Sequence, residues 1–376
     1  MTEPTPATRP DEPPAPAIAA VSGRIFLLDK PEFIRRVPEF LSPDRSGLAA
    51  SGKGGIMKID ALRPYATSPL LCDPAAYLDQ VATPKEPFAL PDDDGALFGT
   101  GLDDVLQGQR QCGAAAAITP TCYVQEGDLA ALNALADAAA AIDRDDVIVA
   151  VPVALPWLTE QRYLSRLIAC LQRIPHPKAV MFGAQWNPFN YASAHANFRR
   201  LLAETTNVGL WRADVLAAFD CMAYGGAFAV IGAGGSLRHL VPPEVRARAS
   251  NWGAHKPAVL LPAMLRYVQA DVIADRYANT PAPRCDCPVC EGRPLDRFDS
   301  LDQETRAEAH DHNAAVWTGW LPDLFGHATD ADRRRWWRGL CQAAVDAHQL
   351  ENLRLGQKDA FKVSTSLRKL AELPLA

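Results

Sequence analysis

Three cysteines and a later histidine have the spacing of a metal site. The segment Cys285-Asp286-Cys287-Pro288-Val289-Cys290 places three thiols within six residues, and His312 follows after 21 intervening residues. Three thiolates this close cannot pair efficiently as disulfides, but they can converge on one tetrahedral Zn²⁺ if a fourth ligand arrives from elsewhere. Because three thiolates and one imidazole leave no open position, the pattern is typical of structural zinc. We expect a structural Zn²⁺ on Cys285, Cys287, Cys290 and His312, and the alternative is a chance group of reduced thiols.

The histidine ligand is expected on a helix. Ser300-Leu301-Asp302-Gln303 has the form of a capping box, and the sequence from Gln303 to Trp320 contains good helix formers and no proline. His310 and His312 are two residues apart, about 200° around such a helix, so only one of them can face the thiolates. His312 shares its stripe with Trp320, which favours it as the ligand.

Short apolar runs alternate with amphipathic segments along most of the chain, which predicts an α/β fold. Several runs lack polar alternation, as expected for strands buried on both faces of a parallel sheet. Asp128–Ile142 and Glu160–Arg173 carry apolar residues at helical spacing. Strand–helix units repeated over about 250 residues favour a (β/α)8 TIM barrel, with a doubly wound open sheet as the competitor. The expected strands are Ile25–Leu28, Gly55–Ile59, Leu70–Cys72, Ala114–Ile118, Val147–Val153, Ala179–Phe182, Val208–Trp211, Ala227–Ile231 and Asp271–Ile273.

Length and composition set the domain organisation. Residues 1–22 hold six prolines and few large apolar side chains, which predicts a disordered tail. We expect the barrel in residues 23–280 and a C-terminal zinc-binding subdomain with further helices in residues 281–376.

No run reaches the roughly 18 apolar residues of a membrane span, and the N-terminus does not resemble a signal peptide, so a soluble cytoplasmic protein without membrane contact is expected. The net charge of −6 means that nucleic acid would need a local basic patch.

Polar residues directly after apolar runs are the candidates for chemistry, because barrel active sites collect at the C-terminal ends of the strands. Each candidate also has an ordinary explanation, such as an aspartate that forms a turn before proline, or a glycine turn. The candidates are Asp73, Gln185, the glycines Gly234 and Gly235, and Asp275.

The segment from Cys285 to His312-Asn313 resembles the zinc motif of the tRNA-guanine transglycosylase superfamily. The resemblance is specific over these residues and diffuse over residues 24–350. It implies a (β/α)8 barrel with a zinc-bearing insertion near its C-terminal end, and the exchange of a guanine for a 7-deazaguanine-type base in tRNA or DNA. The implied mechanism is covalent: one aspartate attacks the ribose C1′, the base leaves, and a second aspartate handles protons.

Three strand ends carry the resemblance further. Leu71-Cys72-Asp73-Pro74-Ala75-Ala76-Tyr77 resembles the family's Asp-Ser-Gly-Gly-Phe motif with alanine at both glycines, which implies that Asp73 is the general acid/base. Val180–Gln185 resembles the strand that ends in a base-contacting glutamine. Val230–Gly235 resembles the strand-end glycine pair that lies against the base, which implies substrate contacts at Gly234 and Gly235.

The nucleophile position leaves two interpretations open. Family members read Asp-Leu/Met-Phe-Asp before the zinc cysteines, but strict register here places Ala274 at the nucleophile and Asp275 one residue later. Either a one-residue slip lets Asp275 attack, or this chain has lost the reaction. The alternatives to an exchange enzyme are a catalytically silent homologue that binds nucleic acid or an active partner subunit, in a homodimer or a heterodimer, and a zinc-stabilised barrel hydrolase of small nucleosides.

The densest basic stretch is Ala331–Arg338, with four arginines and two tryptophans in six positions. On a helix, Arg334, Arg335 and Arg338 share a face that could contact phosphates of nucleic acid. The alternative is a solvated arginine face over a core helix that is anchored by the tryptophans.

Overall fold

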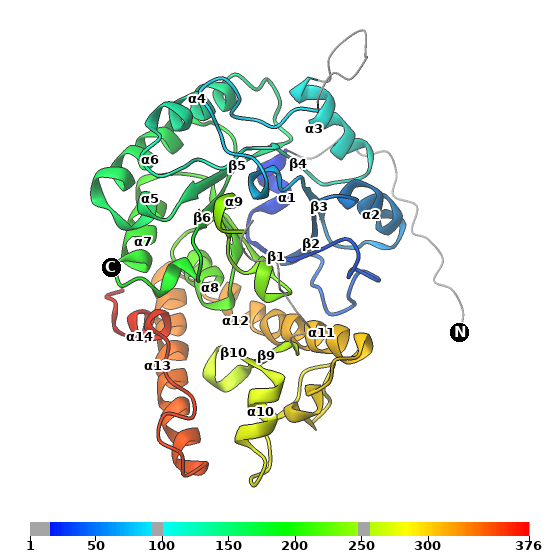
Figure 1. The fold of residues 1–376 in the computed structure, drawn as a ribbon, viewed down its shortest axis with the longest axis vertical. Helices are drawn as coiled ribbons and strands as arrows, with labels where there is room; N and C mark the ends of the chain where they lie inside the picture. Colours follow the sequence, from blue (N-terminus) through cyan, green and yellow to red (C-terminus); the bar gives the residue numbers. More distant parts are fainter. Residues whose placement is uncertain (1–15, 92–100, 247–255, 376) are drawn as a thin grey trace.

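Eight parallel strands form a nearly closed ring with helices around it (Figure 1). This computed structural model describes residues 16–91, 101–246 and 256–375. Neighbouring strands follow chain order, and β8 returns to pair with β1. Between β3 and β4 the backbone N–H of Ala115 donates to the carbonyl of Leu70 at 2.7 Å. The predicted (β/α)8 barrel is confirmed, and the open sheet is excluded. The strands are β1 (Arg24–Asp29), β2 (Ser46–Ser51), β3 (Leu70–Asp73), β4 (Ala117–Ile118), β5 (Val147–Ala154), β6 (Lys178–Gly183), β7 (Val208–Ala213) and β8 (Phe228–Gly232).

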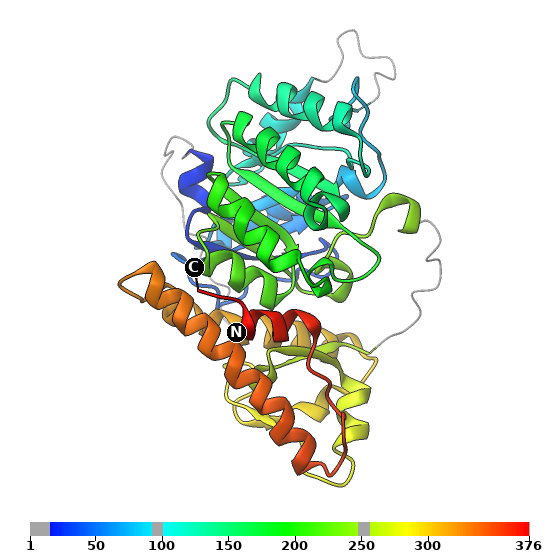
Figure 2. The same ribbon diagram turned by 90° about the vertical axis from the view of Figure 1, so that its left-hand side faces the viewer.

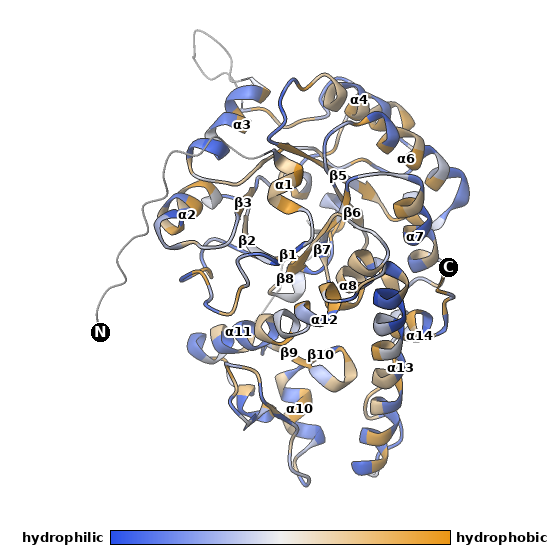
Figure 3. Cartoon of the chain, turned by 180° about the vertical axis from the view of Figure 1, so that it is seen from behind, coloured by the Kyte–Doolittle hydropathy of each residue, from blue (hydrophilic) through white to orange (hydrophobic). Residues whose placement is uncertain are grey.

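The strands are buried on both faces, as their apolar runs predict. All eight residues of β5 are buried, and the strands are hydrophobic in Figure 3 while polar residues lie on the outer surfaces of the helices. Inside the ring, glycines make room for aromatic side chains. A Cβ added at Gly47 would lie 2.3 Å from the Phe26 ring, and one at Gly209 would lie 2.5 Å from the Phe228 ring.

Two expected strands are helices. Gly55–Ile59 lies in α2 (Gly55–Leu62), and Asp271–Ile273 lies in α10 (Ala270–Arg276). The buried residues of α10, Ala270 and Ile273, are three positions apart, which is helical spacing that a short apolar run does not reveal. The sequence interpretation also missed β2, because its buried residues are serine, glycine, alanine and a single leucine, with no β-branched side chain.

The prediction of a disordered tail is wrong for Ala17–Val21, because these residues form the short helix α1. Its Ala17 N–H donates to Asp145 O at 2.8 Å, and Gly23 N–H donates to Ala227 O at 2.8 Å. These backbone hydrogen bonds, together with the buried Ala17, Ala20 and Val21, dock α1 at the N-terminal ends of the strands. Residues 1–15 of the predicted tail lie outside the described residues.

The helices predicted at Asp128–Ile142 and Glu160–Arg173 are confirmed as α4 and α6. Asp128 caps α4 by accepting the Ala131 N–H. The helices of the barrel region are α3 (Leu102–Gln111), α4 (Leu129–Ala140), α5 (Pro156–Thr159), α6 (Gln161–Arg173), α7 (Ala194–Glu204), α8 (Val215–Ala223) and α9 (Pro243–Arg246).

A second lobe follows β8 and carries the cysteine cluster (Figure 2). The hairpin β9–β10 and the helix α10 pack against α11 and the 3₁₀ turn Leu295–Phe298, so this lobe begins before residue 281, the expected boundary. Helices α13 and α14 return along barrel helices α7 and α8. No helix within the described ranges has the length and apolar character to cross a bilayer. The lobe contains β9 (Ala258–Leu261), β10 (Arg266–Gln269), β11 (Arg284–Cys285), β12 (Arg293–Pro294), α11 (Gln303–Gly319), α12 (Leu321–Phe325), α13 (Asp330–Arg354) and α14 (Thr365–Glu372).

Candidate functional site

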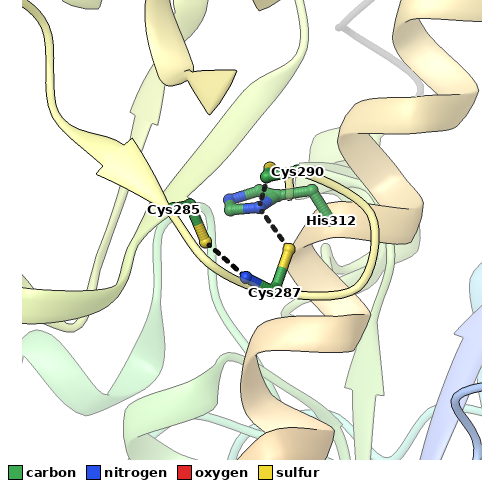
Figure 4. Close-up of side chains that lie close together, drawn as sticks. All are labelled: Cys285, Cys287, Cys290 and His312. Carbon is green, nitrogen blue, oxygen red and sulfur yellow. Dashed lines mark hydrogen bonds between the residues drawn. The ribbon is translucent and has the colours of Figure 1, made fainter. Parts of the chain in front are cut away.

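The four predicted ligands converge at the tip of the β11–β12 hairpin (Figure 4). Their ligand atoms all lie within 4.8 Å of one another. His312 Nδ1 lies 3.1 Å from Cys290 Sγ and 3.4 Å from Cys287 Sγ. Four donors around one tetrahedral ion with bonds of about 2.0–2.3 Å would be about 3.5–3.8 Å apart. The group could therefore hold a metal ion, as the sequence predicts.

Local backbone geometry brings the thiols together. Gly292, with φ of 80°, and Glu291, with φ of 50°, turn the chain back at the hairpin tip. Gly292 N–H donates to Cys285 O at 2.9 Å, which closes the turn. A left-handed conformation suits glycine and is uncommon for other residues. Two consecutive residues in this region make the tight loop that three ligands on one short segment require.

The neighbours of the ligands fix their orientation. His312 Nε2 donates to Leu260 O on β9 at 2.9 Å, which leaves Nδ1 directed at the sulfurs. Asn313 Oδ1 accepts the Leu260 N–H at 2.6 Å. Two neighbouring side chains of α11 therefore bind both the N–H and the carbonyl of Leu260 on β9. Arg297 Nη2 donates to Cys290 Sγ at 3.2 Å, which orients this sulfur.

The cluster favours the ionised form of one thiol, that of Cys287. Hydrogen bonds from Cys285 and Cys290, with His312 beside them, hold the pKa of Cys287 well below its usual value.

The prediction that only one histidine of α11 faces the thiols is confirmed. His310 instead lies near Arg238 and Arg306, and burial lowers its pKa to about 4. The helix begins at the residue after Asp302, which caps it by accepting the Thr305 N–H at 2.7 Å.

Asp73, the last residue of β3, lies in the barrel mouth with both carboxylate oxygens hydrogen-bonded. Oδ1 accepts the Ala75 N–H at 2.9 Å. Oδ2 accepts Tyr77 OH at 2.6 Å, Ser51 Oγ at 2.9 Å and Trp211 Nε1 at 3.2 Å. Asp73 is 1% exposed. Burial raises the pKa of Tyr77 well above its usual value, so the phenol stays a donor. Because β3 and β7 lie on opposite sides of the ring, the Trp211 bond spans the barrel.

Arg212 completes this network from a bulge in β7. The register of β7 against β8 shifts here, and Arg212 has φ of 56°. A regular strand would send Trp211 and Arg212 to opposite faces, whereas the bulge turns both toward Asp73. Arg212 Nε donates to Tyr77 OH at 2.8 Å, and Nη2 donates to Ser51 Oγ at 2.9 Å. The guanidinium and the carboxylate, 4.0 Å apart, are therefore joined through two hydroxyl groups.

The segment after β8 folds over the barrel mouth and pairs with the end of β6. Gly183 and Leu240 form a parallel bridge, and Ala184 N–H donates to Leu240 O at 2.9 Å. Arg212 Nη1 donates to the carbonyl of Ser236 in this segment at 3.4 Å. The loop that carries Gln185 and the loop of the predicted glycines thus meet at the rim, and Gln185 is exposed there.

The glycine that this segment requires is Gly232. A Cβ added at Gly232 would lie 2.3 Å from the Leu237 backbone. A Cβ added at Gly234 or Gly235 would have no atom within 4 Å, so close backbone packing does not require glycine at either of these two positions.

Asp275 does not follow a barrel strand. It is exposed on α10, which packs on β10 and on the 3₁₀ turn Leu295–Phe298 in the second lobe. The buried positions Ala270, Ile273 and Tyr277 direct Asp275 away from the lobe core. The structure does not bring Asp275 together with Asp73, and the expectation of a strand before it is wrong.

The arginines of α13 mainly hold the C-terminal segment. Arg338 Nε donates to Ala371 O at 3.3 Å, and Arg334 Nη1 donates to Leu375 O at 3.5 Å. Arg335 is exposed and pairs with Asp332. This arrangement fits the alternative of an arginine face over a tryptophan-anchored helix, with Trp337 1% exposed.

A buried polar cluster fastens α14 to the barrel. His195 Nδ1 lies 3.2 Å from Asp220 Oδ2, and His195 Nε2 lies 2.7 Å from Ser366 Oγ. Arg199 Nη2 pairs with Asp220 at 2.7 Å. Burial acts to raise the pKa of Asp220, but His195 and Arg199 hold it below its usual value. The serine, histidine and aspartate are each 1% exposed, so this arrangement is a structural link and not an accessible catalytic triad.

Sequence reasoning missed Ser51, Tyr77 and Arg212, and it missed Asp29 at the end of β1. Burial raises the pKa of Asp29 to about 7. Asp29 and Arg212 each follow an apolar run, which is the pattern that identified Asp73 as a candidate.

Comparison of the chain with protein-family models and with curated proteins gives no match.

Proposed function

We propose that this chain is a zinc-stabilised barrel of the tRNA-guanine transglycosylase type that binds nucleic acid, or an active partner subunit, and does not perform the two-aspartate exchange itself. One observation carries this proposal: of the two expected catalytic aspartates, Asp73 is buried and linked to Arg212 through the hydroxyls of Tyr77 and Ser51, and Asp275 is exposed on a helix of the other lobe. A covalent exchange reaction needs an accessible nucleophile and an acid/base group at one sugar.

The donor set supports zinc as the metal. Three thiolates and one imidazole are soft ligands that suit zinc, and they complete its tetrahedral shell. A zinc ion there would join the β11–β12 hairpin to α11. Because Leu260 accepts from His312 and pairs with Asn313, the ion would also fix α11 against β9.

Nucleic acid as the ligand is supported by the resemblance of three strand ends and of the cysteine segment to proteins that act on tRNA or DNA. Gln185 is exposed at the rim where the loops after β6 and β8 meet, and an amide there could read the edge of a base. A base would have to leave its stack to reach this rim.

A covalent trap on a denaturing gel tests the proposal. The protein is incubated with labelled tRNA or labelled DNA and a 7-deazaguanine base, and the reaction is compared with native binding of the same nucleic acid. We expect binding without a covalent band, and zinc in equimolar amount. A covalent band that disappears in Asp73→Asn would contradict a silent homologue.

The exchange enzyme is the second candidate, because Asp73 does lie at an inward strand end, as that reaction requires. A band lost in Asp73→Asn and kept in Asp275→Ala would support this candidate with Asp73 as the reacting group. Loss of the band in Asp275→Ala alone would mean that the two lobes rearrange to bring Asp275 to the mouth.

A further inference from the structure

Two neighbouring loops at the C-terminal end of the barrel form an exposed surface that we call the basic rim. One loop follows β1 and the other follows β2 and leads into α2. Lys58 Nζ donates to Ile34 O at 3.0 Å, and the Cβ position of Gly54 lies 3.9 Å from Pro31, so the loops are packed together. The members of the basic rim are Phe33, Arg35, Arg36, Lys53, Ile56 and Met57.

The two packed loops of the basic rim expose three large apolar side chains. Phe33 is 56% exposed, Ile56 is 45% exposed and Met57 is 75% exposed. Scattered apolar side chains are normal on a protein surface, but a group of them at a functional edge indicates a binding site. An exposed phenylalanine ring also offers a face on which a nucleobase can stack.

The charge of these loops contrasts with that of the whole chain. Residues 30–36 and 52–58 contain five lysines or arginines and one glutamate, whereas the chain carries a net charge of −6. Arg35, Arg36 and Lys53 are exposed and form no ion pair with any residue that the structure describes. Because no direct ion pair engages them, these side chains can contact a phosphate backbone.

The basic rim lies between the barrel mouth and the metal lobe. Lys53 is two residues beyond Ser51, whose hydroxyl donates to Asp73. On the other side is Asp311 of α11, which directly precedes the ligand His312. Asp311 lies within electrostatic range of Arg36 and Arg35, so the loop after β1 faces that helix.

We propose that the basic rim binds a single strand of nucleic acid, with phosphates on Arg35, Arg36 and Lys53 and a base on Phe33. Cationic side chains interleaved with an aromatic face suit an unpaired strand, because its bases are free to stack. The inference rests on the proposed nucleic-acid function. It assigns the contact surface to the barrel rim, whereas the arginines of α13 are engaged with the C-terminal segment.

The test is fluorescence anisotropy of a labelled single-stranded oligonucleotide, as DNA and as RNA, over a series of salt concentrations. The test variant replaces Arg35, Arg36 and Lys53 by alanine. The matched control replaces three exposed arginines outside the basic rim, Arg162, Arg166 and Arg368. A further variant is Phe33→Ala. Circular dichroism confirms that each variant melts like the wild type.

We expect the triple rim variant to bind at least tenfold more weakly, and the slope of log K against log salt to become shallower by about 2, since each phosphate contact on a single strand contributes about 0.7. Phe33→Ala should weaken binding about fivefold or more, in line with about 1–3 kcal/mol per stacked base. The control should bind like the wild type.

Other results would overturn the inference in distinguishable ways. Wild-type binding that the rim variants leave unchanged would refute the basic rim as the surface and leave the proposed function standing. No oligonucleotide binding by the wild type, even at low salt, would refute both. Binding to vesicles of anionic phospholipid but not to oligonucleotides would replace nucleic acid by a membrane surface.

Discussion

Removing the carboxylate of Asp73 should destabilise the barrel far more than removing an exposed carboxylate. In Asp73→Ala, the Arg212 guanidinium, whose side chain is 2% exposed, keeps its charge but loses its counter-charge. Tyr77, Ser51 and Trp211 lose their common acceptor. Breaking a buried ion pair by removing one partner costs about 3–5 kcal/mol, and we expect a loss of unfolding free energy in that range.

A double variant separates the unpaired charge from the lost hydrogen bonds. Adding Arg212→Met removes the uncompensated charge, so the double variant should lose about 1–3 kcal/mol less than the sum of the two single changes. Urea unfolding at pH 7, followed by circular dichroism, measures each value. The control is Asp137→Ala, because Asp137 is exposed and pairs with Arg173 at the surface. A loss below about 1 kcal/mol for Asp73→Ala, or strict additivity, would refute the reasoning.

Three further predictions test the remaining features. Cys290→Ser should abolish metal binding and lower the melting temperature. Cys170→Ser, at a buried cysteine away from the cluster, should keep the metal. Mass spectrometry under native conditions measures the bound metal in both variants. Asp29 has a pKa of about 7 in the folded chain against about 3.9 in the unfolded chain, so its contribution to stability is present below pH 4 and is lost as the pH rises toward 7. Asp29→Asn should therefore exceed the wild type in stability at pH 8 and match it at pH 4. The pKa of Asp220 is shifted in the opposite direction, so Asp220→Asn should be less stable than the wild type at pH 7 and approach it in acid. Equal pH profiles of stability for the two variants would contradict this assignment. Gly232→Ala should cost about 1–3 kcal/mol in urea unfolding, because its Cβ would lie 2.3 Å from the segment that covers the barrel mouth, and an unchanged midpoint would show that this segment moves freely.

The barrel could be predicted because most of its strands are uninterrupted apolar runs. Val147–Val153 and Ala179–Phe182 are recognisable since a strand buried on both faces needs no polar positions. The same logic failed at Gly55–Ile59 and Asp271–Ile273, where short apolar runs fit either period and tertiary contacts selected helices. It failed again at β2, whose small residues leave room for the Phe26 ring inside the barrel.

The sequence alone determined the metal cluster, because three ligands lie on one short segment and a helix period selects His312 over His310. The barrel mouth was decided by tertiary structure. Asp73, Trp211 and Arg212 are far apart in the chain, and they meet only because the ring places β3 opposite β7 and a bulge turns two consecutive side chains inward. Tertiary structure also decides the position of Asp275. Its segment is a helix and not the expected strand, so Asp275 lies on the surface of the other lobe and not at the barrel mouth. Local spacing fixes ligands on one segment, whereas contacts between distant strands depend on closure and register, which no local pattern contains.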